Sequence, residues 1–155
     1  MKQVCHIRWM IRRDMPRVMQ IDGLCFEYSW TEDEYICLLR QRNCIGMVAE
    51  LRDEVVGYMI YELHKRRLDL IVLAVDPGYS RRGIGSAMIE KLASKLSPLR
   101  RNRITCCVSD SNLHAQLFLR DQGFRAVGVL RGAGIDGSDE YEMVYRVKEE
   151  VVIDE

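Results

Sequence analysis

Apolar and polar positions along this chain follow two different periods, and the changes between them divide it into predicted strands and helices. Strand-like runs, either alternating or continuously apolar, occur at residues 6–11, 46–51, 55–63, 68–75, 104–108, 124–130 and 141–147. Apolar residues recur at helical spacing at residues 14–24, 31–40, 84–96 and 112–122. The predicted order is therefore β-α-α-β-β-β-α-β-α-β-β. We expect one mixed α/β domain over residues 1–148, without repeat or linker, and a loose tail over residues 149–155.

Capping signals place the ends of these helices. The residues predicted to start them are Asp14 at the first, Thr31 with Glu34 in a capping box at the second, and Ser111 or Asn112 at the fourth. Pro98 is predicted to end the third helix, because the residue before a proline disfavours the helical conformation. Gly123 is predicted to terminate the fourth helix as its C-cap.

The composition narrows the class of protein and of ligand. The 155 residues include 23 basic and 23 acidic side chains, and this balance argues against bulk electrostatic binding to nucleic acid or to acidic membranes. No apolar run approaches the roughly 20 residues needed to span a bilayer. The segment after Met1 lacks the apolar core of a signal peptide. We therefore expect a cytoplasmic protein without a membrane or nucleic-acid partner.

The cysteines indicate packing rather than metal binding. The chain has six cysteines and three histidines, and no two cysteines have the C-x-x-C spacing of common zinc sites. Most of the cysteines lie in apolar segments, which favours reduced thiols buried in the protein. The sequence therefore predicts no metal site.

One loop carries the most specific chemistry. The apolar run 70–75 stops at Asp76-Pro77-Gly78, and a basic loop with Gly83 and Gly85 leads directly into a helix. The first N–H groups of a helix have no intrahelical partner, and the helix dipole adds about half a positive charge there. Glycines allow an anion to approach the backbone closely. This order predicts a cradle in which main-chain amides, with Arg81 and Arg82, hold a diphosphate.

Two well-known phosphate motifs are excluded at this loop. The dinucleotide fingerprint requires a third glycine three residues after the second, and Met88 stands there. The P-loop requires a Lys followed by Ser or Thr after its last glycine, and this loop has no such Lys. The sequence supports neither a Rossmann site nor a nucleoside triphosphatase.

The whole pattern resembles the GNAT superfamily of acetyl-CoA-dependent N-acetyltransferases, over nearly the full chain. Three local segments are similar to its RimI type, which acetylates protein N-termini. They are Phe26-Glu27-Tyr28-Ser29-Trp30-Thr31-Glu32, then Ala74-Val75-Asp76-Pro77 with Tyr79, and Ser111-Asn112 followed by Gln122-Gly123-Phe124. The resemblance implies a mostly antiparallel seven-stranded sheet, splayed between strands 4 and 5 and flanked by about four helices.

The resemblance also implies where acetyl-CoA binds. Leu73, Ala74 and Val75 would pair with the pantetheine arm as an exposed strand edge does with a peptide. The pyrophosphate would be bound by Arg81, Arg82, Gly83, Ile84, Gly85 and Ser86. Asn112 would contact the coenzyme near its thiol end. The family motif begins with Gln or Arg where this chain has Ser80, a mild departure because main-chain amides make most of the phosphate contacts.

The catalytic positions depart further from the family. RimI-type enzymes use a Glu on the fifth strand and a Tyr in the fourth helix, and the matching residues are Cys107 and Leu119. Leu119 cannot donate a proton, although a thiolate with a pKa near 8.5 leaves fairly well unaided. Cys107 can serve as a base only if its pKa is lowered.

Other side chains remain open as candidates for the missing groups. Asp69 interrupts an apolar strand where some branches of the superfamily have a Glu base, and Glu62 lies on the neighbouring strand. Tyr141 is a candidate proton donor. Trp30 and Glu62 are candidates for contacting the acceptor at the entrance of the site.

The sequence thus predicts direct attack of a primary amine on the acetyl thioester, without a covalent enzyme intermediate. The oxyanion is expected to be stabilised by a backbone N–H near Ala74 or Val75. The acceptor is expected to be a protein or peptide N-terminus. The alternatives are a small amine or polyamine acceptor, or an acetyl-CoA-binding module with little turnover. The chain is expected to be a monomer or a homodimer.

Overall fold

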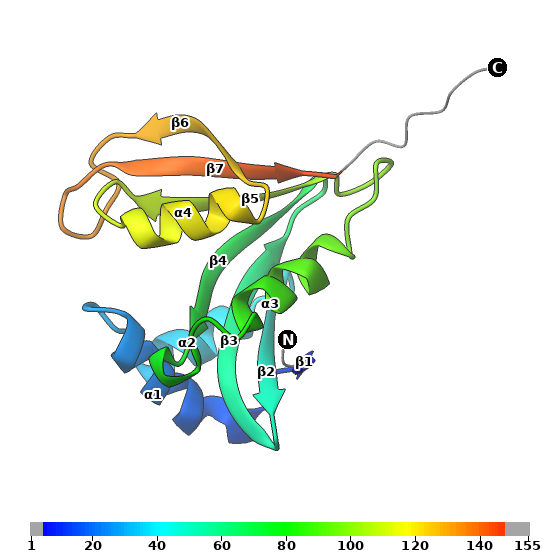
Figure 1. The fold of residues 1–155 in the computed structure, drawn as a ribbon, viewed down its shortest axis with the longest axis vertical. Helices are drawn as coiled ribbons and strands as arrows, with labels where there is room; N and C mark the ends of the chain where they lie inside the picture. Colours follow the sequence, from blue (N-terminus) through cyan, green and yellow to red (C-terminus); the bar gives the residue numbers. More distant parts are fainter. Residues whose placement is uncertain (1–4, 148–155) are drawn as a thin grey trace. The chain divides into compact units, whose positions relative to one another are not determined.

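A computed structural model describes residues 5–147 of the chain, and Figure 1 shows its helices and strands. The predicted tail at residues 149–155 lies outside the described residues. The elements are β1 (His6–Trp9), η1 (Arg12–Asp14), α1 (Met15–Cys25), α2 (Glu32–Leu39), β2 (Cys44–Leu51), β3 (Glu54–Leu63), β4 (Arg67–Val75), η2 (Pro77–Tyr79), α3 (Ile84–Ala93), β5 (Arg103–Ser109), α4 (Leu113–Asp121), β6 (Arg125–Leu130) and β7 (Glu140–Arg146). Their order confirms the sequence of strands and helices that the hydrophobic pattern predicts.

The strands form a seven-stranded sheet in the order β1-β2-β3-β4-β5-β7-β6. The pairs β1–β2, β2–β3, β5–β7 and β6–β7 are antiparallel, which confirms the mostly antiparallel sheet. β4 and β5 are parallel, and their register joins Arg67–Asp69 to Arg103–Thr105. The splay expected between these two strands beyond Asp69 stays a prediction. No helix among residues 5–147 is both long and apolar enough to cross a membrane.

The described residues form two compact units, one of residues 5–63 and 70–92 and the other of residues 64–69 and 93–147. The first unit buries a core between α1, α2 and the strands β2 and β3, with Val18, Ile21, Val48 and Ile60 fully buried. Each such side chain contributes about 1.5–3 kcal/mol when it leaves water. The amphipathic pattern of the first two helices is therefore explained by one apolar core.

A polar cluster lies inside the same core. The Asp22 carboxylate accepts hydrogen bonds from the hydroxyls of Tyr35 at 2.7 Å and Tyr58 at 3.0 Å. Burial is the largest cause that raises the pKa of both tyrosines. These bonds join α1, α2 and β3 and hold the helices in register on the sheet.

The second unit packs α4 against one face of β5, β7 and β6. Leu119, Phe124, Cys106 and Met143 are buried there. Gly123 ends α4 with φ +104°, and a Cβ at this position would lie 3.2 Å from the ring of Tyr145. Only glycine meets both conditions without strain, so Gly123 terminates the helix, although it stands one residue after the C-cap, Gln122.

The helix ends show where local sequence signals succeed and where they fail. Thr31 and Asn112 cap α2 and α4 as predicted, because their side-chain oxygens accept the N–H groups of Glu34 at 3.2 Å and Ala115 at 3.1 Å. The predicted end of α3 at Pro98 is wrong, since α3 stops at Ala93. The N–H of Leu96 donates to the carbonyl of Ala93, three residues back, so a tight turn replaces the helix before the proline.

Asp14 occupies the N-cap position of α1 but does not cap the helix with its side chain. Its buried carboxylate instead pairs with Arg8 at 2.8 Å and accepts the N–H of Ile11 at 2.8 Å. The hydrogen bond from Arg8 is the largest cause that lowers the pKa of Asp14. Arg8 of β1 therefore binds the carboxylate that the local sequence pattern predicts to cap the helix.

Candidate functional site

The glycine-containing loop of the first unit has the backbone shape of an anion cradle. It runs from η2 to the first residue of α3, Ile84. Arg81 has φ +64° and Gly83 has φ +80°, with Arg82 between them in the ordinary negative-φ range. Such an alternation of left- and right-handed residues turns successive N–H groups toward one concave side, and concavities of this kind bind anions. The N-terminus of α3, with the positive end of its helix dipole, follows directly.

Asp76 fixes the entry to this loop. Its carboxylate accepts the N–H of Gly78 at 2.8 Å and a guanidinium N–H of Arg17 at 2.6 Å. The pKa of Asp76 is lowered mainly by the hydrogen bond from Gly78, and the hydrogen bond and charge of Arg17 lower it further. Arg17 also donates through Nε to the carbonyl of Val55 at 2.8 Å. The turn after β4 is therefore tied to α1 and β3 by charge-assisted bonds.

Tyr79 positions one of the two arginines of the loop. The guanidinium of Arg82 lies 5.0 Å from the centre of the Tyr79 ring, within cation–π distance. The Tyr79 hydroxyl donates to Glu54 at 3.0 Å, and this bond is the largest cause that raises the pKa of the tyrosine. Arg82 is thus held beside the loop, where its charge adds to that of the helix terminus.

Along β4, the peptide N–H and C=O groups of successive residues point alternately toward β3 and away from it. The N–H of Asp76 donates to the carbonyl of Val56 on β3 at 2.8 Å, and a Cβ at Gly57 would lie 3.0 Å from the carbonyl oxygen of Ala74. The peptide groups of residues 74 and 76 therefore face β3. By strand alternation those of Leu73 and Val75 face away from it. The predicted pairing with a pantetheine arm is available to Leu73 and Val75, whereas Ala74 is directed toward β3.

Cys25 is a neighbour of this edge that sequence reasoning missed. Its thiol lies 3.2 Å from the carbonyl oxygen of Val75 and donates to it. Burial raises the pKa of the Cys25 thiol, and Asp76 raises it further. No spacing or motif in the sequence links residues 25 and 75, so only the fold reveals this contact. On the same strand as Val75, the side chains of Ile71 and Leu73 are half-buried.

The second unit contains the predicted catalytic residues. The hydroxyl of Thr105 donates to Asp69 at 2.6 Å, and the two residues are partners in the parallel pair of β4 and β5. Thr105 is buried and Asp69 is half-buried. One carboxylate oxygen is thus held by a fixed hydroxyl, which orients the side chain.

Cys107 lies two residues further along β5, on the same face of the strand as Thr105. It is exposed, and its partner in the antiparallel pair with β7 is Glu142. Partial desolvation is the largest cause that raises the pKa of the Cys107 thiol, and the carboxylates of Glu140, Asp69 and Glu142 raise it further. A thiol in this environment stays protonated near neutral pH, so the lowered pKa that a cysteine base requires is not present.

Glu142 is a carboxylate that the sequence analysis missed. It stands directly across from Cys107 on one side and Gly128 on the other. A Cβ at Gly128 would lie 3.9 Å from its Oε2 atom, so the side chain extends over β6 on this face. Finding Glu142 from sequence needs the register between β5 and β7, which no local pattern supplies.

The other predicted side chains have different surroundings. Tyr141 pairs with Val108 and Val129, so it lies on the opposite face of these strands from Cys107. Leu119 is buried in the core under α4. The structure therefore brings together Asp69, Cys107 and the newly found Glu142, but not Tyr141.

Two acceptor candidates and one coenzyme candidate are held by local contacts. Trp30 is half-buried, with its ring centre 5.1 Å from that of Tyr35. Glu62, at the end of β3, accepts a hydrogen bond from Asn43 at 3.4 Å. The side-chain oxygen of Asn112 is used by the cap of α4, which leaves its NH₂ group to donate.

This chain is similar to a protein-family model, to two curated relatives and to a solved structure. A model of the acetyltransferase (GNAT) family matches residues 15–124. The chain is 26% identical over 143 residues to the N-alpha-acetyltransferase of Sulfurisphaera tokodaii, with 84% of this chain and 86% of the relative covered. It is 24% identical over 118 residues to the ribosomal protein bS18-alanine N-acetyltransferase of Salmonella typhimurium, with 76% and 79% covered. The structure of Ard1 from Thermoplasma volcanium has a TM-score of 0.84 at 24% identity, with 94% of this chain and 99% of that chain covered.

Proposed function

The chain belongs to the acetyltransferase (GNAT) family, and on that premise we propose that it transfers the acetyl group of acetyl-CoA to the α-amino group of a protein or peptide N-terminus. Enzymes of this family use acetyl-CoA. Of the two relatives named above, one is called an N-alpha-acetyltransferase and the other a ribosomal protein bS18-alanine N-acetyltransferase, and these names support this choice of acceptor. The family match and the backbone shape of the predicted phosphate loop both support this reaction.

The first unit supplies the coenzyme site in this proposal. The main-chain N–H groups of residues 81–86 bind the pyrophosphate, helped by the dipole of α3. The peptide groups of Leu73 and Val75, which face away from β3, pair with the pantetheine arm. The N–H of Val75 is the donor that we assign to the developing oxyanion, because alternation directs that of Ala74 toward β3. The backbone geometry of this loop is the observation that carries the proposal.

The second unit supplies the proton acceptor. An amine attacks only as the free base, and the proton released on attack must reach a base. The carboxylates of Asp69 and Glu142 are the acceptors that we assign, acting through water, because the protonated thiol of Cys107 is unsuited to the task. The acetyl carbonyl carbon gains the bond to nitrogen and loses the bond to sulfur, and the thiolate of CoA leaves. Buried Leu119 gives no acid, which is tolerable for a leaving group with a pKa near 8.5.

These weak bases favour an α-amine over a lysine or polyamine amine. An α-amino group has a pKa of about 8, so about a fifth of it is neutral at pH 7.4. A lysine-type amine has a pKa of about 10.4, and only about one molecule in a thousand is neutral at that pH. At pH 7.4 the neutral, reactive fraction is therefore about 200-fold larger for an N-terminus than for a lysine-type amine. An enzyme that acts on an N-terminus does not have to compensate for this difference by deprotonating the amine.

An acceptor panel tests the proposal. It compares a lysine-free peptide with a free N-terminus, the same peptide with a blocked N-terminus and one lysine, and spermidine. We expect the first to be acetylated with at least a hundredfold larger kcat/KM. Faster acetylation of spermidine or of the lysine peptide would favour the small-amine alternative, and acetyl-CoA binding without turnover on any acceptor would favour the binding module.

A further inference from the structure

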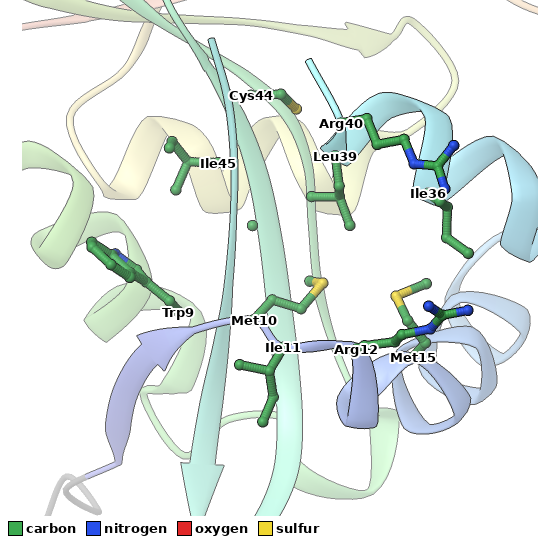
Figure 2. Close-up of a pocket in the computed structure, with 11 residues that line it drawn as sticks. Trp9, Met10, Ile11, Arg12, Met15, Ile36, Leu39, Arg40, Cys44 and Ile45 are labelled. Carbon is green, nitrogen blue, oxygen red and sulfur yellow. The ribbon is translucent and has the colours of Figure 1, made fainter. Parts of the chain in front are cut away.

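A hollow in the first unit lies beside the end of β1, the end of α2 and the start of β2 (Figure 2). It has a volume of about 440 Å³, which is within the range of pockets that hold small molecules. Apolar side chains line it, among them Met10, Ile36, Leu39 and Ile45. It shares no residue with the phosphate loop or with β4, so it has no part in the proposed acetyl transfer.

The charged side chains that line this hollow are both positive. Arg12 lies in η1 and Arg40 directly follows α2, and Figure 2 shows their guanidinium groups on the same side of the hollow. Both arginines are exposed, and no ion pair joins either of them to another residue within 5–147. Burial is the largest cause that raises the pKa of the lining thiol, Cys44, to about 11, so this thiol is uncharged at neutral pH. The hollow therefore favours an anionic ligand.

The apolar part of the lining is only partly covered in the described structure. Trp9 is 72% exposed and Ile11 is 47% exposed, and both side chains line the hollow. A ligand with a hydrocarbon chain would remove this apolar surface from water, which favours its binding. A small inorganic anion would leave the same surface exposed. The hollow is therefore complementary to an anion that carries an aliphatic chain.

The size of the hollow favours a small molecule over a protein partner. Eleven residues line it, about half of the 20–30 residues that each side of a stable protein–protein interface uses. With about 30 Å³ for each group of the size of a water molecule, it has room for about ten carbon atoms and a carboxylate. Guanidinium groups bind carboxylates through charge-assisted hydrogen bonds. We propose that this hollow binds an aliphatic carboxylate of about ten carbons, with its chain against the apolar lining and its carboxylate at Arg12 and Arg40.

Trp9 gives a direct readout of this binding, because it lines the hollow. The chain has two tryptophans, so Trp30→Phe makes the emission specific for residue 9. Decanoate is titrated into the full-length Trp30→Phe chain at concentrations below those at which it forms micelles. We expect saturable binding that lowers the efficiency of acrylamide quenching of Trp9 at least threefold. Unchanged quenching up to millimolar decanoate would overturn the proposal.

Two comparison ligands separate the contribution of the hydrocarbon chain from that of the charge. Each fully buried methylene group contributes about fourfold to Kd, so hexanoate, which is four methylenes shorter, should bind at least tenfold more weakly than decanoate. Decan-1-ol keeps the chain without the charge, and it should also bind at least tenfold more weakly. If hexanoate or decan-1-ol binds as tightly as decanoate, the hollow recognises only a charge or only a chain, and the proposal is wrong.

Calorimetry of the full-length chain with both tryptophans tests the two arginines. Arg12→Gln together with Arg40→Gln should weaken decanoate binding at least tenfold. Arg42→Gln is the matched control, because Arg42 is exposed and does not line the hollow, and it should change the Kd less than threefold. These measurements need no acetyl-CoA, so their outcome is independent of the proposed acetyl transfer. Decanoate binding that is indifferent to the double substitution, or no heat of binding in the original chain, would contradict the proposal.

Discussion

Because Glu142 lies directly opposite Cys107, we predict that removing its carboxylate slows the acceptance of the amine proton. Glu142→Gln removes one carboxylate from the face that carries Asp69 and Cys107, while it keeps the size of the side chain. Proton transfer by a positioned side chain typically contributes 10²–10⁴-fold to a rate. Because Asp69 remains, we expect the lower end, a fall of about a hundredfold in kcat, with the Kd for acetyl-CoA unchanged.

The register allows the carboxylate to be restored from the opposite strand. Directly opposed residues of an antiparallel pair have Cβ atoms about 4.5–5.5 Å apart, so a Glu at position 107 reaches the same space as Glu142. Cys107→Glu in the Glu142→Gln background is therefore expected to recover kcat to within about tenfold of the original chain. Cys107→Glu alone places two carboxylates about 5 Å apart, a repulsion of about 3 kcal/mol at an effective dielectric constant of about 20 and less at this exposed site. That repulsion raises the shared pKa of the pair.

Steady-state kinetics with the lysine-free peptide acceptor, together with calorimetric binding of acetyl-CoA, measure these effects. Glu140→Gln is the control, because Glu140 lies on the same strand and face but opposite Ser109. We expect it to change kcat by less than threefold. A Glu142→Gln enzyme within twofold of the original rate refutes the assignment of Glu142. A failure of Cys107→Glu to rescue an otherwise folded double variant refutes the inference from register.

Four further outcomes follow from the structure. Asp69→Asn should lower kcat at least tenfold with little change in acetyl-CoA affinity, and steady-state kinetics that show an unchanged rate would remove Asp69 as a base. Asp76→Ala loses two charge-assisted bonds, each worth about 1.5–3 kcal/mol before the partial exposure of the site reduces it, and calorimetry should show acetyl-CoA binding at least tenfold more weakly. Because the pKa of the Cys107 thiol is raised, its alkylation by iodoacetamide, followed by mass spectrometry, should accelerate only above about pH 9, and fast labelling at pH 7 would contradict this environment. Because the pKa of Asp14 is lowered below its ordinary 3.8, its contribution to stability is complete above that pH and is lost as the pH falls through the folded-state value, so Asp14→Asn should reduce the free energy of unfolding at pH 7 more than at pH 2.5 in urea titrations.

The sequence predicted the order of elements because the hydrophobic period of the strands and helices is clear along the chain. It predicted the cap at Asn112 and the box at Thr31, because these signals act within four residues. It placed the N-cap of α1 at Asp14 correctly, but not the partner of the Asp14 carboxylate, which pairs with Arg8 of β1 instead of capping the helix. It also failed at the end of α3, where a turn at Ala93 acts before Pro98. Local signals therefore hold until a tertiary partner or an earlier turn overrides them.

In the candidate site, too, local sequence signals could be predicted and tertiary contacts could not. The proposed phosphate loop is continuous along the chain, so the sequence alone could predict its residues. The relation of Cys107 to Glu142 depends on strand register, and that of Cys25 to Val75 on the packing of α1 beside β4. Neither follows from a motif. The candidate cysteine base is disfavoured for reasons visible only in three dimensions: the partial burial of its thiol and the carboxylates around it both raise its pKa.

At the centre of the proposed function is the binding of a diphosphate by the backbone between residues 81 and 86. Calorimetric titration of the full chain with acetyl-CoA and with S-acetyl-pantetheine, which has the same thioester arm but no diphosphate, tests this binding most directly. We expect acetyl-CoA to bind at least a hundredfold more tightly than the truncated thioester. Equal affinity for the two compounds, or no binding of acetyl-CoA at millimolar concentration, would contradict the proposed role of this loop.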